Sequence, residues 1–163
     1  MRKSPVLSAI LVGGLIAGTF DITYATVFSA FYGVTATRVL QSVASGVMGP
    51  AAMSGGAFAA TLGFILHFLI ALTWATLFSL ICRLVPALVR HPIPAGLVYG
   101  SIIYVLMYLV VAPLSACVIK FTFTPATVTR NLLVHMFLIG LPIALAARTF
   151  LPSADRTRPR ASG

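Results

Sequence analysis

The sequence predicts an all-α integral membrane protein with four transmembrane helices and a short helix between the first two. Three observations predict this fold class. Of the 163 residues, 60% are hydrophobic and only 8% are charged, whereas charged residues make up about 25% of a typical soluble domain. The mean hydropathy is +1.06. Most apolar runs are longer than a buried core helix and reach the roughly 20 residues that a helix needs to cross a bilayer.

The predicted spans form one domain, residues 1–151, and polar or proline-containing stretches separate them. We expect the spans at about residues 6–31, 55–85, 93–118 and 126–151. Pro113 should bend the third span, because proline removes one backbone hydrogen bond from a helix. Residues 152–163 hold three arginines among Pro, Ser and Gly, a composition typical of a disordered tail. In the cytoplasm, such a basic tail could bind anionic lipid.

The segment between the first two spans, residues 32–54, is too polar and too interrupted to cross a membrane. Apolar residues recur along it at helical spacing, at Val39, Leu40, Val43 and Val47. Polar residues lie opposite them, at Arg38, Gln41, Ser42 and Ser45. This pattern predicts a short amphipathic helix that lies on the outer membrane surface or re-enters the membrane. Gly46, Gly49 and Pro50 should end it.

Small residues recur every four positions in three of the spans, so that another helix backbone can approach closely. The predicted packing residues are Gly14 and Gly18 in the first span, Gly55, Ala59 and Gly63 in the second, and Gly96 and Gly100 in the third. Four helices make a thin bundle. We therefore expect small-residue stripes to join copies in a homo-oligomer, or to bind a larger membrane complex.

Two pairs of segments suggest a tandem repeat of helical hairpins. Gly14-Leu15-Ile16-Ala17-Gly18 is similar to Gly96-Leu97-Val98-Tyr99-Gly100, and Phe68-Leu69-Ile70-Ala71-Leu72 is similar to Phe137-Leu138-Ile139-Gly140-Leu141. Such a repeat would relate two hairpins by an axis along the membrane normal. Asp21 would then correspond to Ile103, so the second hairpin lacks the acid.

The distribution of basic residues favours both termini in the cytoplasm. In that orientation eight of the 11 Lys and Arg residues lie inside, and three lie outside, namely Arg38, Lys120 and Arg130. Positive residues concentrate on the cytoplasmic side, and Arg130 should extend its side chain to the membrane surface. Topology thus explains the net charge of +9, and we expect no nucleic-acid partner. An alternative is that the N-terminus is a signal peptide cleaved near Ala25, but the apolar run to Phe31 suits a span better.

The candidates for proton titration inside the predicted spans are Asp21, His67 and His135. An ionised carboxylate at the centre of a membrane helix costs about 2.5–3.5 kcal/mol, so Asp21 needs a partner, a proton or a function. At about 1.5 Å per helical residue, all three could share one level of the bundle. Such a cluster could relay protons, because histidine changes its charge near neutral pH. The alternative is structural, with each side chain hydrogen-bonded to a neighbouring helix.

Other chemistry is less compatible with the sequence. Two histidines on different helices also occur in bis-histidine haem ligation, and Asp21 with both histidines could hold a metal. The estimated levels of the two histidines along the bundle differ by about one helical turn, so they are poorly placed to ligate one haem from both sides. We expect neither a metal nor a cofactor. Nucleophile–base sets, phosphate-binding loops and zincin motifs are absent. We therefore expect no enzyme.

Several motifs resemble those of the YagU-like inner-membrane proteins of bacteria, an uncharacterised family. They are Gly14-x-x-Ala17-Gly18-x-x-Asp21, Val39-Leu40-Gln41-Ser42-x-Ala44-Ser45-Gly46, Gly55-Gly56 and Gly63-x-x-x-His67-Phe68. The resemblance covers about residues 10–115. It implies a small multi-pass protein of the bacterial inner membrane with a loose association with acid resistance, and it carries over no functional residues.

Together these observations lead to three functional hypotheses. The first is a bacterial inner-membrane protein that supports transport or acid tolerance through a buried Asp21–His67 pair. The second is a non-catalytic accessory or structural subunit of a larger membrane complex. The third is a haem-binding electron carrier.

Overall fold

The computed structural model describes residues 4–151, and this part of the chain is helical, with four helices long and apolar enough to cross a membrane. The first is α1 (Pro5–Ala30) and the second is α3 (Gly56–Leu84). The third joins α5 (Pro92–Leu106), the π-helical η2 (Met107–Val111) and α6 (Ala112–Leu114). The fourth joins α7 (Pro125–Val134), the π-helical η3 (His135–Gly140) and α8 (Leu141–Phe150). The predicted class, a multi-pass all-α membrane protein, is confirmed.

Local sequence accounts for most helix ends. Proline occupies the first turn of α1, α5 and α7, where the missing N–H has no helical acceptor to lose. Thr124 begins α7 with a capping box in which its side chain and that of Thr127 accept each other's backbone N–H. The helix α1 runs without a break through Ala25, the residue near which a signal peptide could end.

The third span is shorter than predicted, because it ends at Leu114 rather than near residue 118. Ser115 adopts an extended conformation, and its hydroxyl accepts a hydrogen bond from Cys117 N. The next residues pair with a different element: Ala116 N donates to Gly46 O, and Val118 N donates to the Ser45 hydroxyl. These partners replace the hydrogen bonds of a further helical turn.

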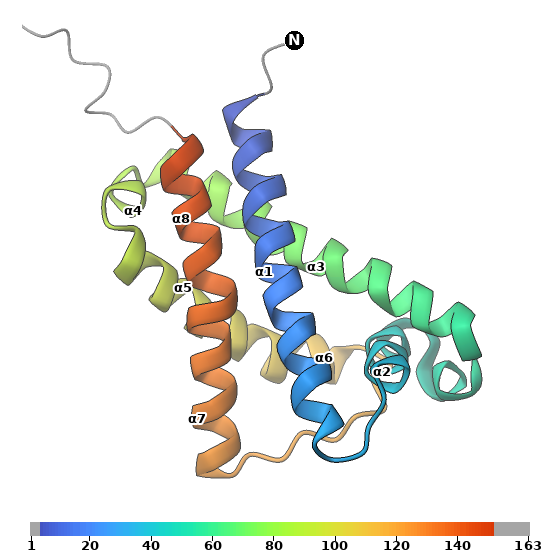
Figure 1. The fold of residues 1–163 in the computed structure, drawn as a ribbon. Helices are drawn as coiled ribbons and strands as arrows, with labels where there is room; N and C mark the ends of the chain where they lie inside the picture. The colour runs from blue at the N-terminus through green and yellow to red at the C-terminus, as the bar shows by residue number, and fades with distance from the viewer. Residues whose placement is uncertain (1–3, 152–163) are drawn as a thin grey trace, which may run out of the picture.

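The helices form a bundle in which α1 packs against both α3 and α8 (Figure 1). The start of α1 and the end of α8 lie at one end, together with the short helix α4 (Ala87–Arg90). The opposite end holds α2 (Ala36–Met48), the 3₁₀ helix η1 (Gly49–Ser54) and the connection of residues 115–124. At that end α1 and α7 stand apart. The predicted basic tail, residues 152–163, lies outside the described residues.

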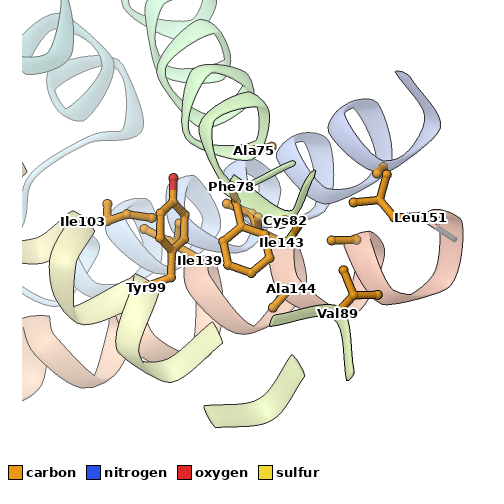
Figure 2. Packing of buried hydrophobic residues seen from close by; sticks show 13 residues of the cluster. Ala75, Phe78, Cys82, Val89, Tyr99, Ile103, Ile139, Ile143, Ala144 and Leu151 are labelled. Carbon is orange, nitrogen blue, oxygen red and sulfur yellow. The ribbon is translucent and has the colours of Figure 1, made fainter. Parts of the chain in front are cut away.

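Buried side chains fill the half of the bundle that contains α4, which we call the closed half (Figure 2). Phe78 of α3 packs on Tyr99 of α5 with ring centroids 4.7 Å apart. The Tyr99 hydroxyl donates to Trp74 O at 2.7 Å, so the polar group of this buried tyrosine has a hydrogen-bond partner. Ile103, Ile139 and Ile143 complete the packing. A pocket of about 420 Å³ remains beside this cluster, between the end of α3, α4 and the start of α5, and Phe78 and Tyr99 line it.

The short helix predicted between the first two spans is present as α2. Gln41 and Ser45 are 5% and 0% exposed, whereas Val47 is 68% exposed. The polar side chains Gln41 and Ser45 therefore pack on the protein, while Val39, Val43 and Val47 line a cavity beside α2. The reason is hydrogen bonding: Arg38 and Gln41 donate to the carbonyls of Met53 and Gly56, which lie in η1 and at the start of α3. Gly46 lies inside α2, which ends at Gly49 with φ 60°.

The predicted packing residues lie mostly at contacts within the bundle. A Cβ on Gly14 would lie 3.0 Å from Leu72 Cα, and one on Gly18 would lie 3.0 Å from the Phe68 ring. Ala59 is fully buried and Gly63 faces the carbonyl of Leu40, so both mark the crossing of α3 with α2. Gly55 is different, because it precedes α3 and its nearest neighbour is Ala59 of the same segment.

The segments that suggested a tandem repeat make matching contacts. Gly14 lies against Leu72, and its counterpart Gly96 lies against Leu141, where a Cβ would come within 2.8 Å of the Leu141 Cα. Leu72 and Leu141 are themselves counterparts in the repeat. Gly18 likewise faces Phe68 and Ala71, while Gly100 contacts His135, Met136 and Gly140. Each pair of similar sequences thus forms a similar helix–helix contact.

Candidate functional site

The other half of the bundle is hollow and contains two adjoining cavities. The first, of about 490 Å³, lies between α1, α3, α5, η2 and the α7–η3 segment, and we call it the Asp21 chamber. The second, of about 930 Å³, extends from it toward α2, and we call it the α2 chamber. Asp21, His67 and Tyr108 line both. The closed half ends at the Asp21 chamber, because Ile103 and Ile139 belong to the buried cluster and also line the chamber.

The structure brings Asp21, His67 and His135 to the wall of the Asp21 chamber. They come from α1, α3 and η3, which are far apart in the sequence. Their grouping follows from the two glycine contacts described above, which bring α3 against α1 and η3 against α5. The common level estimated from helical rise agrees with this arrangement.

Asp21 is partly exposed to the chamber. Within residues 4–151 its carboxylate forms neither a salt bridge nor a hydrogen bond, and no side-chain oxygen or nitrogen there is buried without a partner. Asp21 lines both chambers, so its carboxylate borders the cavity space. An acid that lacks a fixed partner is available to a proton or a ligand.

His67 links α3 to α1. Its Nε2 lies 2.9 Å from Gly18 O, three residues before Asp21. Because a carbonyl can only accept, Nε2 carries the hydrogen, and Nδ1 is the nitrogen that can accept a proton. His67 therefore both holds the helix that carries Asp21 and presents a basic nitrogen beside the chamber.

His135 is held by its own helix and by two aromatic rings. Its Nδ1 donates to Asn131 O at 2.8 Å, so Nε2 is the free nitrogen. The ring packs edgewise against Tyr104 and Tyr108, with centroids 5.6 and 5.7 Å away. His135 begins the π-helical segment η3, and such segments often occur at functional sites because they redirect side chains.

Arg130 also lines the Asp21 chamber, and the expected extension of its side chain to the membrane surface stays a prediction. Its guanidinium carbon lies 4.2 Å from the centre of the Phe28 ring of α1, and its Nε donates to Asn131 Oδ1 at 3.3 Å. The sequence holds one indication of this arrangement. Asp21, Tyr24 and Phe28 are spaced i, i+3 and i+7, so an acid and two aromatic residues share one face of α1.

The three predicted titratable residues do not form a metal site in the described structure. Within residues 4–151, no group of three or more His, Cys, Asp or Glu side chains is close enough to hold a metal ion. Cys82 and Cys117 are both free thiols. The chemistry of the site is therefore that of one carboxylic acid, two imidazoles with a free nitrogen each, and one guanidinium, all around a cavity.

Comparison with known proteins adds no assignment, because no family model, curated protein or solved structure matches this chain.

Proposed function

We propose that this chain is a small multi-pass protein of a bacterial inner membrane that supports proton-linked transport or acid tolerance, with Asp21, His67 and His135 as its titrating groups. The observation that carries the proposal is the Asp21 chamber, where an acid without a fixed partner shares one cavity with two histidines. A membrane-embedded ionisable residue that faces a cavity is the usual arrangement of a proton or substrate pathway. The resemblance of residues 10–115 to YagU-like proteins agrees with this proposal.

The orientation favoured by the basic residues gives the proposal a direction. With both termini in the cytoplasm, the hollow half faces the outside and the closed half faces the cytoplasm. A proton from outside would reach Asp21 through the chambers, and the cluster around Phe78 and Tyr99 would block its further path. Transport therefore requires that α3 and α5 separate at this cluster, as in alternating access.

Proton flux into liposomes tests the proposal directly. Purified protein is reconstituted with a trapped pH-sensitive dye, and the rate of internal acidification is measured after an external acid pulse. Asp21→Asn should slow this rate at least about tenfold relative to wild type, because an amide cannot exchange a proton at these pH values. Asp21→Glu should retain flux. Equal rates for wild type and Asp21→Asn would overturn the proton role.

Two other hypotheses from the sequence have separate tests. An accessory subunit should tolerate Asp21→Asn in cells and co-purify with a partner, whereas the transport proposal requires loss of function in this variant. A haem carrier would show a Soret band in the purified protein.

The predicted homo-oligomer depended on the small-residue stripes as contacts between copies. Five of those residues lie instead at contacts within one protomer, namely Gly14, Gly18, Gly63, Gly96 and Gly100.

A further inference from the structure

The Asp21 chamber contains a cation whose hydrogen-bonding groups are largely unused. Arg130 Nε donates a hydrogen bond to Asn131 Oδ1, and one face of the guanidinium lies over the Phe28 ring. Within the described residues it forms no salt bridge, although Asp21 lines the same chamber. Both terminal nitrogens remain, and a guanidinium presents them as a fork that matches a carboxylate with two parallel hydrogen bonds.

The surroundings of the chamber are also positively charged. Arg38 lines the α2 chamber, and Lys120 lines a third cavity of about 190 Å³ that shares Arg130 and Asn131 with the Asp21 chamber. Three permanent cations thus surround a site that holds a single acid. Cavities lined by one sign of charge concentrate ions of the opposite sign, so anions are favoured at the entrance and at Arg130.

The rest of the wall of the Asp21 chamber is apolar and aromatic. Phe28, Trp74, Ile103 and Ile139 contribute to it. Its volume of about 490 Å³ falls within the roughly 300–1,000 Å³ of small-molecule sites, which combine apolar walls with a few polar groups that orient the ligand. Arg130 is the one permanent cation of this chamber, so a dianion would bring a second charge without a partner.

We propose that the Asp21 chamber binds a small apolar monocarboxylate, whose carboxylate pairs with the terminal nitrogens of Arg130 and whose apolar part extends along the apolar and aromatic wall of the chamber. This inference rests on the proposed function, since it names the class of solute whose movement the protonation of Asp21 would accompany. Asp21 must be protonated when the solute is bound, because two carboxylates in one chamber repel each other.

Trp74 provides the test, because it is the one tryptophan of the sequence and it lines the chamber. Benzoate is titrated into the purified protein in lipid nanodiscs, with benzamide as the neutral molecule of the same shape. Trp74 fluorescence and radiolabelled benzoate are measured in parallel. Benzoate should bind at least about tenfold more tightly than benzamide, because only the carboxylate forms charge-assisted hydrogen bonds with Arg130.

Variants locate the site. Arg130→Gln should weaken benzoate binding at least about tenfold, whereas Arg130→Lys should retain part of it, because lysine keeps the charge without the fork. Arg148→Gln is the matched control, since Arg148 lies in α8 and donates to Arg90 O at 3.0 Å, in the closed half. It should bind benzoate as wild type does. Circular dichroism checks that each variant is folded.

Several outcomes would overturn the inference: no binding of benzoate in either measurement, equal binding of benzamide, unchanged binding in Arg130→Gln, or equally strong binding of inorganic phosphate. The proposed function fails separately. If benzoate binds through Arg130 but Asp21→Asn leaves proton flux unchanged, the carboxylate-binding site is supported and the proton role of Asp21 is rejected. If proton flux depends on Asp21 and benzoate does not bind, the solute assignment falls alone.

Discussion

The two hairpins of the bundle share a packing pattern and differ in what they contribute to the site. The first hairpin, α1 with α3, consists of regular α-helices and carries Asp21 and His67. The second hairpin, α5–α6 with α7–α8, contains both π-helical segments, and Ile103 takes the place of Asp21. Ile103 is 1% exposed and lies where the buried cluster meets the Asp21 chamber. The same position in the repeat is therefore a partly exposed acid in the first hairpin and a buried apolar residue in the second.

The difference also extends to how closely the helices approach. In the second hairpin, Gly140 lies directly against the backbone of Gly96 and Gly100, whereas its counterpart Ala71 in the first hairpin carries a side chain. The π-helical segment η3 ends at Gly140 and begins at His135. It thus combines a close backbone contact with the placement of a histidine at the chamber.

Placing an acid at the counterpart of Asp21 in the second hairpin should have the largest effect on the unfolding free energy. Ile103→Asp places a carboxyl at a position that is 1% exposed, at the edge of the buried cluster, so we expect a loss of about 3 kcal/mol or more in unfolding free energy. Asp21→Ile should change this free energy by less than about 1 kcal/mol, because Asp21 borders a cavity. Denaturant titration followed by circular dichroism measures both, with Ile103→Val as the size control. Similar losses in the two variants would contradict the contrast between the buried position of Ile103 and the partly exposed position of Asp21.

Adding a methyl group to each glycine contact should have an intermediate effect. Gly140→Ala drives a Cβ into the backbone of Gly96 and Gly100, which should cost about 1–3 kcal/mol. Gly18→Ala meets the Phe68 ring at 3.0 Å and the Ala71 Cβ at 3.2 Å, and the ring can move, so the cost should stay below about 1 kcal/mol. Both variants gain the same helix propensity, so their difference in thermal midpoint isolates the contact. A larger loss in Gly18→Ala would refute the tighter packing of the second hairpin.

Removal of the His67 hydrogen bond should have the smallest effect. In the second hairpin the counterpart of His67 is Met136, which lies against Gly100 without such a bond. His67→Ala should be less stable than His67→Gln by about 0.6 kcal/mol, the average for a hydrogen bond between membrane helices, because the glutamine amide can still donate to Gly18 O. The two free energies come from parallel unfolding titrations. Equal values would mean that the bond does not hold α1 to α3.

Much of the fold follows from local sequence. Four apolar runs of sufficient length predict the spans, and proline and threonine at their starts predict where helices begin. The end of the third span and the packing of α2 were not predictable in this way. The third span ends where residues 116–118 bond to Gly46 and Ser45, about 70 residues earlier in the chain. The packing of α2 depends on the bonds of Arg38 and Gln41 to the carbonyls of Met53 and Gly56.

The sequence by itself determined that the protein is apolar enough to span a membrane four times, and it singled out Asp21, His67 and His135 as candidate titrating groups that could share one level of the bundle. These properties depend on composition and on the fixed rise of a helix. Only the tertiary structure decided that the Arg130 guanidinium lies over Phe28, and that the main buried cluster occupies one half of the bundle while the two adjoining chambers occupy the other. Such features depend on which side chains meet across helices, and helical periodicity within one segment does not specify its partners.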